Sequence, residues 1–139
     1  MILELMTCAM LMKPLPEWRS KMIWEPAQII YDNGSNLICY NITDEERALL
    51  ERCVMSEAGG ESYDVQEAVA TVILNRVFAP DKFNATITGV ITADGQFSTH
   101  DNGEPTVSVK LAVHNALQYY GGAYQCIPSQ IYYFRSGHY

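Results

Sequence analysis

The sequence predicts a single α+β domain that is mostly helical and carries a small β element. Three segments have the apolar spacing of helices, and capping residues, glycine or proline bound them. Two short segments, 36–42 and 131–134, are rich in the β-branched and aromatic residues that strands favour. The chain has 139 residues, of which 48% are hydrophobic, and this is enough for one domain with a sizeable core.

The N-terminal segment over residues 1–40 is predicted to be irregular. Three prolines interrupt any helix there, and Tyr31–Asn36 (YDNGSN) is a turn cluster. The following NLICYNI, residues 36–42, is predicted to be a short strand that leads into the main domain at 41–139. The first residues are apolar but too short to span a bilayer, and they lack the basic start of a secretory signal. Two interpretations of these first residues are open: a leader, or a segment that packs on the domain.

A helix is predicted to begin after Thr43, where TDEE forms a capping box with Glu46 as the reciprocal partner. One apolar face follows at Leu49, Leu50, Cys53 and Val54. Glu57 falls on the same face, one turn beyond Cys53. Gly59 and Gly60 then end the helix.

The second helix is predicted over residues 62–77. Its sequence is apolar almost all round from Val69 to Leu74, which is typical of a central, buried helix, and Pro80 lies beyond its end.

Two further helices are predicted in the second half of the chain. The first, over 84–92, is short and capped by Asn84 or Thr86, and a polar loop over 93–105 follows it. The other runs roughly over 105–120.

Glu57 is the candidate for acid–base chemistry. A carboxylate on an apolar face loses hydration and stays protonated to a higher pH, as a general acid requires. The glycines directly after it allow a bulky ligand to approach the backbone. A different reading is a solvated glutamate at a helix end, or one paired with Arg52 or Arg76.

Composition and motif content exclude several classes of function. The net charge of −7 provides no basic surface for nucleic acid or for an anionic membrane. The four cysteines contain no CxxC pair and the three histidines no HExxH, so no metal site is predicted.

The segment SEAGGESYDVQEAVATVILNRV, residues 56–77, resembles the signature of the cell wall hydrolase family typified by the spore-cortex-lytic enzyme SleB. Members of that family carry a helix ending in E-A-x-G-E and then a helix close to VAVAAVILNRV. ITGVI…GQFS over 87–98 and IYYFRSG over 131–137 also match. The resemblance covers about residues 42–139. Members also carry a further segment after these aromatic residues, so the chain is expected to be short at its C-terminus.

The resemblance implies a lysozyme-like domain that cleaves peptidoglycan between N-acetylmuramic acid and N-acetylglucosamine. It implies Glu57 as the catalytic acid and a lytic transglycosylase mechanism with a single carboxylate, without a metal or organic cofactor. The implied partner is peptidoglycan, with no nucleic acid and no membrane span, and the protein is expected to be a monomer. It would act at the bacterial cell wall or spore cortex.

The resemblance also implies residues that line the sugar cleft. Gln96 is placed to bond an N-acetyl group and Phe97 to stack on a sugar face, with Phe97 in the core as the alternative. Ser98 is a further polar candidate, and Tyr133 is the cleft-facing residue of the aromatic segment. Glu61 is expected either to orient the cleft or a water, or to start the second helix. Arg76 is expected to have a structural role, bound to a carboxylate or a carbonyl.

Two other function classes are open from the sequence. A cysteine peptidase acting on wall peptides would use Cys53 or Cys126 as nucleophile and His114 or His138 as base. A non-catalytic wall-binding module would bind the polymer without releasing products.

Overall fold

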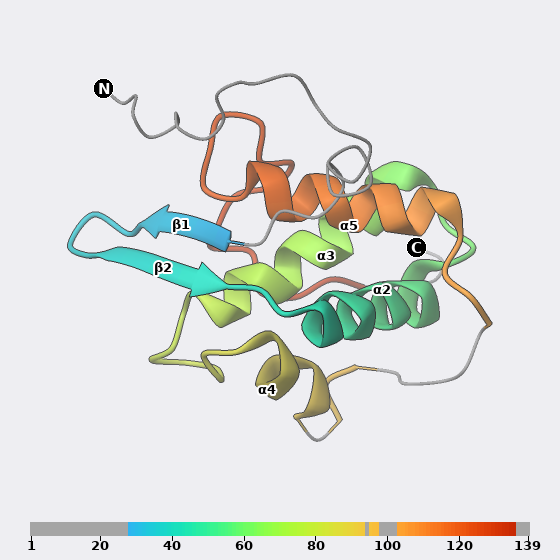
Figure 1. The fold of residues 1–139 in the computed structure, drawn as a ribbon, viewed down its shortest axis with the longest axis horizontal. Helices are drawn as coiled ribbons and strands as arrows, with labels where there is room; N and C mark the ends of the chain where they lie inside the picture. The colour runs from blue at the N-terminus through green and yellow to red at the C-terminus, as the bar shows by residue number, and fades with distance from the viewer. Residues whose placement is uncertain (1–27, 94, 98–102, 136–139) are drawn as a thin grey trace, which may run out of the picture.

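The computed structural model describes residues 28–93, 95–97 and 103–135. In chain order, the elements are β1 (Gln28–Asp32), β2 (Leu37–Asn41), α2 (Asp44–Ala58), α3 (Tyr63–Val77), α4 (Ile87–Thr92) and α5 (Val107–Tyr119). Figure 1 shows the β1–β2 hairpin at one end of a group of helices. The predicted α+β class, mostly helical with a small β element, is confirmed.

Of the two hairpin strands, only β2 was predicted from the sequence. β1 and β2 pair antiparallel, from Gln28 opposite Asn41 to Asp32 opposite Leu37. The predicted turn cluster forms the tip, where Gly34 has a φ of +93° and the Asn33 side chain accepts the N–H groups of residues 35 and 36. β1 lies inside the region predicted to be irregular. Its strand character depends on pairing with β2 and not on a local sequence pattern.

The helix α2 begins as predicted. The Thr43 hydroxyl accepts the N–H of Glu46, and the Glu46 carboxylate accepts the N–H of Thr43, which completes the capping box. The other carboxylate oxygen of Glu46 accepts the Tyr40 hydroxyl at 2.7 Å, and the N–H of Ile87 donates to that hydroxyl at 2.8 Å. One tyrosine of β2 therefore connects the starts of α2 and α4.

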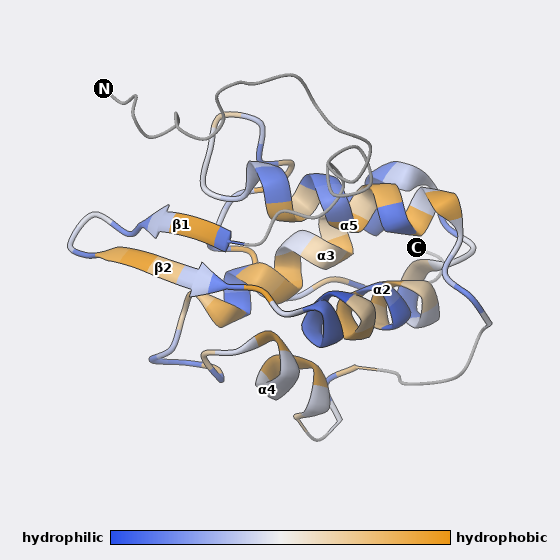
Figure 2. Cartoon of the chain, viewed as in Figure 1, coloured by the Kyte–Doolittle hydropathy of each residue, from blue (hydrophilic) through white to orange (hydrophobic). Residues whose placement is uncertain are grey.

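The helix α3 is the centre of the molecule, as its sequence predicted. Every residue from Val69 to Val77 is buried. The helix contacts α2, α4 and α5, which lie around it in Figure 1, and much of its ribbon has the hydrophobic colour in Figure 2. Ser62 caps its start.

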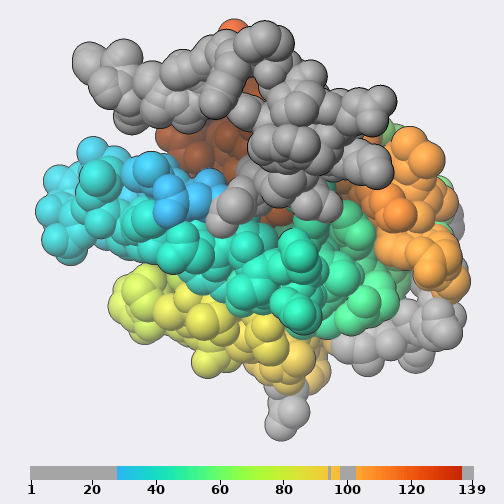
Figure 3. Space-filling model, in the orientation of Figure 1, coloured from blue at the N-terminus to red at the C-terminus, as the bar shows by residue number. Residues whose placement is uncertain are grey.

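The two later helices also begin at threonine caps. Thr86 caps α4, which decides between the two predicted capping residues, and Thr106 caps α5. In the space-filling view of Figure 3, α2 crosses the front face between α4 and α5. No helix in the described ranges is long and apolar enough to cross a bilayer.

The aromatic segment over residues 131–135 is not a strand, so that prediction was wrong. Side chains of α3 bind its carbonyl groups: Asn75 Nδ2 donates to Ile131 O at 2.8 Å and Arg76 Nε to Tyr132 O at 2.8 Å. The sheet of the described chain contains β1 and β2 alone, so this segment pairs with neither strand. Exposure nevertheless alternates along the segment, with Tyr133 69% exposed between two partly buried neighbours.

Candidate active site

Glu57 lies in the last turn of α2, one turn beyond Cys53 as predicted. Its side chain is partly buried rather than fully enclosed. Burial, and to a lesser extent the negative charge of Glu57, raises the pKa of the Cys53 thiol to about 12. The carboxylate of Glu57 therefore lies close to a buried, neutral thiol at the edge of the core.

The turn between α2 and α3 is held by one buried side chain, Gln66. Its amide nitrogen donates to three carbonyl oxygens of the turn, those of Ala58 at 3.0 Å, Glu61 at 3.2 Å and Gly59 at 3.4 Å. Its amide oxygen accepts the hydroxyl of Ser108 on α5 at 2.6 Å. Gln66 is 2% exposed; its bond to Ala58 is buried, and the other three are partly buried. They fix the backbone directly after Glu57.

The two glycines of the turn have different roles. Gly59 adopts right-handed helical angles, and a Cβ there would lie 2.5 Å from the Met55 carbonyl oxygen. A Cβ on Gly60 would meet no atom within 4 Å. Close packing therefore requires glycine at residue 59, whereas residue 60 has room for a side chain.

Glu61 is exposed at the end of this turn. Its N–H donates to the Ala58 carbonyl at 3.0 Å, and its own carbonyl is one of those that Gln66 binds. Ser62 rather than Glu61 caps α3, and Asp64 is the acidic residue of the first turn. Of the two predicted roles for Glu61, the helix-start role thus belongs to its neighbours.

Three predicted sugar-binding residues gather around Arg76, near the C-terminal end of α3. The Nη1 atom of Arg76 donates to Gln96 Oε1 at 2.8 Å, and its guanidinium carbon lies 4.8 Å from the Phe97 ring centroid and 4.9 Å from that of Tyr133. The Phe83 ring is also 4.9 Å away. We call Arg76, Phe83, Gln96, Phe97 and Tyr133 the Arg76 cluster.

The Arg76 side chain is buried and multiply bound, which confirms the predicted structural role. It is 4% exposed, and its Nε binds the Tyr132 carbonyl. Burial lowers the pKa of its guanidinium, while the nearby Tyr133 raises it. Phe97 packs against the core and also stacks on Phe134 with ring centroids 6.1 Å apart, so it joins the core and the cluster.

The structure therefore divides the predicted site residues into two groups at opposite ends of α3. Gln66 holds the Glu57 turn near the start of the helix, and Arg76 holds the cluster near its end. At 1.5 Å per residue, Gln66 and Arg76 are about 15 Å apart along the helix axis.

Two of these residues, Gln66 and Phe83, were not predicted from the sequence to belong to the site. Gln66 lies on the buried stripe of α3 with Val69, Ala70 and Ile73. A polar residue within an apolar stripe is a signal that could have identified it. Phe83 carried no comparable signal, because its place depends on Arg76. Ser98 lies outside the described residues.

Neither of the two candidate nucleophiles, Cys53 and Cys126, has the lowered thiol pKa of a reactive cysteine. The pKa of Cys53 is raised as described above, and burial also raises the pKa of Cys126, whose sulfur lies 3.2 Å from the Thr71 hydroxyl. His114 is buried on α5, and His138 lies outside the described residues. A raised thiol pKa disfavours the reactive thiolate.

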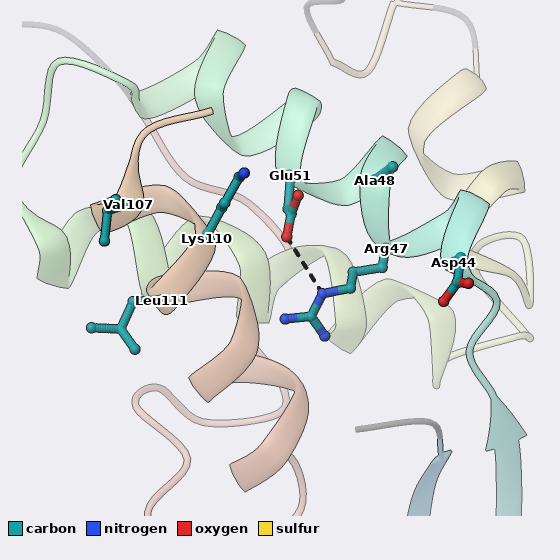
Figure 4. A pocket seen from close by; sticks show the side chains of 7 residues that line it. All are labelled: Asp44, Arg47, Ala48, Glu51, Val107, Lys110 and Leu111. Carbon is teal, nitrogen blue, oxygen red and sulfur yellow. Dashed lines mark ion pairs between the residues drawn. The ribbon is translucent and has the colours of Figure 1, made fainter. Parts of the chain in front are cut away.

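Two cavities lie away from the predicted site residues. One of about 490 Å³ is between α2 and α5 (Figure 4), and one of about 450 Å³ is between the hairpin and the loop after α5. Glu57 and the residues of the Arg76 cluster are not among the lining residues of either.

Comparison with known proteins agrees with the sequence resemblance. The model of the Cell Wall Hydrolase family matches residues 60–138, a range that begins three residues after Glu57 and contains the other predicted site residues. The chain is similar to the solved catalytic domain of the Bacillus cereus SleB protein, with 32% identity over 63% of this chain and a TM-score of 0.51. It covers 66% of that domain, just under two thirds. No curated protein matches the sequence. Because the family match extends over more than half of the chain, the chain belongs to the cell wall hydrolase family.

Proposed function

We propose that this protein cleaves the glycan strand of peptidoglycan between N-acetylmuramic acid and N-acetylglucosamine, with Glu57 as its acid and base. The observation that carries the proposal is the position of Glu57. It is a partly buried carboxylate at a helix end, followed by a turn whose carbonyls Gln66 binds and in which Gly60 has room for a side chain. Membership of the cell wall hydrolase family supports the choice of substrate.

The proposed reaction is that of a lytic transglycosylase with a single carboxylate. Protonated Glu57 donates its proton to the glycosidic oxygen as the bond from that oxygen to muramic C1 breaks. The resulting carboxylate then takes the proton of the muramic 6-hydroxyl as this oxygen bonds to C1. The products are a 1,6-anhydromuramic end and a free 4-hydroxyl, and Glu57 regains its proton. No water is consumed, and no second carboxylate acts as nucleophile.

The Arg76 cluster is proposed to bind sugars on one side of the reacting bond. Arg76 fixes the amide of Gln96 by binding its oxygen, so Gln96 would meet the carbonyl of an N-acetyl group through its nitrogen. The 69% exposed ring of Tyr133 offers a flat face for a sugar, and Phe97 supports it from the core side. Glu61 and Ser98 are proposed to contact the same polymer.

The test is digestion of purified peptidoglycan, with and without muramic lactam, with soluble fragments identified by mass spectrometry. The native chain is compared with Glu57→Gln and with Glu45→Gln, an exposed glutamate in the first turn of the same helix. Removing a general acid typically lowers the rate 10²–10⁴-fold. We expect anhydromuramic ends from the native chain and from Glu45→Gln, and a rate lower by about that factor from Glu57→Gln.

Other product patterns would contradict the proposal in distinct ways. Reducing ends would show hydrolysis by water and would direct attention to a second carboxylate, beginning with Glu61. Cleaved peptide bonds would favour the cysteine peptidase, whose activity a thiol alkylator would abolish. Binding to insoluble wall without soluble products would favour a binding module.

A further inference from the structure

The cavity between α2 and α5 is lined by both apolar and charged side chains, and we call it the α2–α5 groove. Figure 4 shows its lining residues coming from the first half of α2 and the start of α5. Three are apolar, two are acidic and two are basic: Ala48, Val107, Leu111, Asp44, Glu51, Arg47 and Lys110. Its volume of about 490 Å³ is within the range of small-molecule sites, so it can take large side chains.

The α5 side of the groove carries apolar surface that is left in water. Val107 is 82% exposed, and Leu111, one turn further along the same face of α5, is only partly buried. Exposed apolar surface that gathers in a hollow marks a site of interaction. Asp44 and Lys110 are also exposed, and neither makes an ion pair within the described ranges. The occupant that fits therefore carries large apolar side chains together with charges of both signs.

The chain that precedes β1 enters the described domain beside this groove. Gln28 pairs with Asn41 across the hairpin, and their side chains are joined by a hydrogen bond of 2.8 Å. Asp44, which lines the groove, comes three residues after Asn41 at the start of α2. In Figure 1, β1 begins at the end of the hairpin next to the helices, and the hairpin tip points away from them. Three residues span at most about 11 Å, so residues 1–27 end close to the groove.

Residues 17–25 of that stretch, EWRSKMIWE, have the chemistry that the groove requires. They contain both tryptophans of the chain, Trp18 and Trp24, whose large side chains gain much from leaving water. They also contain two acidic and two basic residues: Glu17, Glu25, Arg19 and Lys21. Trp24 is four residues before Gln28, at most about 14 Å of extended chain, and Trp18 has a longer reach.

We propose that residues 17–25 of this chain cover the α2–α5 groove, with their tryptophans against Val107 and Leu111. Their basic residues then meet the carboxylate of Asp44, and their acidic residues meet the ammonium group of Lys110. The segment reaches the groove in its own molecule because the strand that follows it begins there. The exposed apolar wall of α5 thereby becomes an internal contact of the full chain.

Tryptophan fluorescence tests this proposal directly, because both tryptophans lie in the proposed segment. Quenching by acrylamide is measured for the full chain when folded and when unfolded in urea. We expect the folded chain to be protected from quenching relative to the unfolded chain. Val107→Asp places a charge on the apolar wall and should remove most of this protection. The variant should still fold, since Val107 is exposed and an acidic residue suits the first turn of a helix, and circular dichroism checks its helix content.

Two further variants separate the groove from other surfaces. Lys110→Glu reverses an exposed charge of the groove and should remove part of the protection. The matched control is Leu37→Asp on the hairpin, at an apolar residue that is 71% exposed and does not line the groove, and it should leave the protection unchanged.

Four outcomes would overturn the inference. The first is equal quenching of the folded and the unfolded native chain, and the second is protection that neither groove variant reduces. Loss of protection in Leu37→Asp alone would place the segment on the hairpin instead. Loss of protection on dilution of the native chain would show that the segment occupies a second copy. None of these readouts involves glycan cleavage, so the inference and the proposed function can fail separately.

Discussion

At the scale of single residues, burial controls the protonation of side chains near the candidate site. Cys53 is 3% exposed, and its neighbour Glu57 adds a negative charge. Both effects favour the neutral thiol in the folded chain. In the unfolded chain the thiol has its ordinary pKa near 9. The two states therefore bind different numbers of protons between about pH 9 and pH 12.

This difference predicts a loss of stability at alkaline pH. The raised pKa of Cys53 means that the unfolded state releases a proton above pH 9 while the folded state keeps it. The free energy of unfolding should then fall by up to about 1.4 kcal/mol per pH unit between pH 9 and pH 12 from this thiol alone. In Cys53→Ala the slope should be shallower by about that amount, as measured by urea unfolding at several pH values.

The exposed cysteine of β2 provides the control for this prediction. Cys39→Ala should change the slope much less, because Cys39 is exposed. Equal slopes for the native chain and Cys53→Ala would contradict the account. Cys53→Ala also removes buried volume and lowers stability at neutral pH, but that loss shifts the whole curve and leaves its slope unchanged.

At the scale of elements, the turn between α2 and α3 depends on a residue that is not in the turn. Gln66 supplies its donor group to carbonyls of residues 58, 59 and 61, and Ser108 of α5 fixes the Gln66 amide from behind. Helix ends leave carbonyl groups without partners, and these bonds satisfy them. The geometry of the Glu57 turn thus depends on two other helices.

Replacing Gln66 with leucine should loosen the turn before it affects the rest of the fold. The change removes the Gln66 bond from three carbonyls and from the Ser108 hydroxyl, although the Ala58 carbonyl keeps the N–H of Glu61, and it costs about 1–3 kcal/mol of stability. Amide exchange should accelerate most at Gly59 and Glu61, whose N–H groups bond to Met55 and Ala58 across this turn. Hydrogen exchange followed by NMR checks the expectation.

A milder variant separates the bonds that Gln66 makes to the turn from the bond that it makes to Ser108. Ser108→Ala removes only the bond to the Gln66 oxygen, so its effects on stability and on exchange at the turn should be smaller. Uniform acceleration across α5 and the turn in Gln66→Leu would mean global destabilisation and would refute a local role.

At the scale of the whole molecule, Arg76 joins parts that are far apart in the sequence. It binds Gln96, 20 residues later, and the carbonyl of Tyr132, 56 residues later. Neighbouring Asn75 binds the carbonyls of Pro128 and Ile131 and accepts the Tyr120 hydroxyl. The end of α3 therefore holds the C-terminal segment in place of a β-sheet.

Arg76→Lys should lower the free energy of unfolding by about 2–4 kcal/mol. Lysine keeps the charge but cannot reach both oxygens with a planar fork, and it loses the stacking on the three rings. Urea unfolding should show a lower midpoint. Lys82→Ala, at an exposed lysine, should stay within about 0.5 kcal/mol of the native chain. A comparably small effect of Arg76→Lys would show that the cluster adds little to stability.

The sequence by itself determined the helices and their starts. Capping residues and apolar spacing act within a few residues, so α2, α3, α4 and α5 were predicted close to their observed places, and Glu57 to its place one turn beyond Cys53. The family was also recognisable from the contiguous segment over residues 56–77, which the family match supports from residue 60 onward.

Only the tertiary structure decided what lies beside what. It added β1, whose strand character depends on pairing with β2, and it removed the predicted strand over 131–134, whose carbonyls are bound by Asn75 and Arg76 instead. It placed Gln96, Phe97 and Tyr133 around the buried Arg76 near the end of α3. It placed Glu57 in the last turn of α2, just before α3 begins. Local sequence sets the backbone of a helix through contacts between near neighbours. The grouping of distant side chains depends on how the helices pack, which no short stretch of sequence specifies.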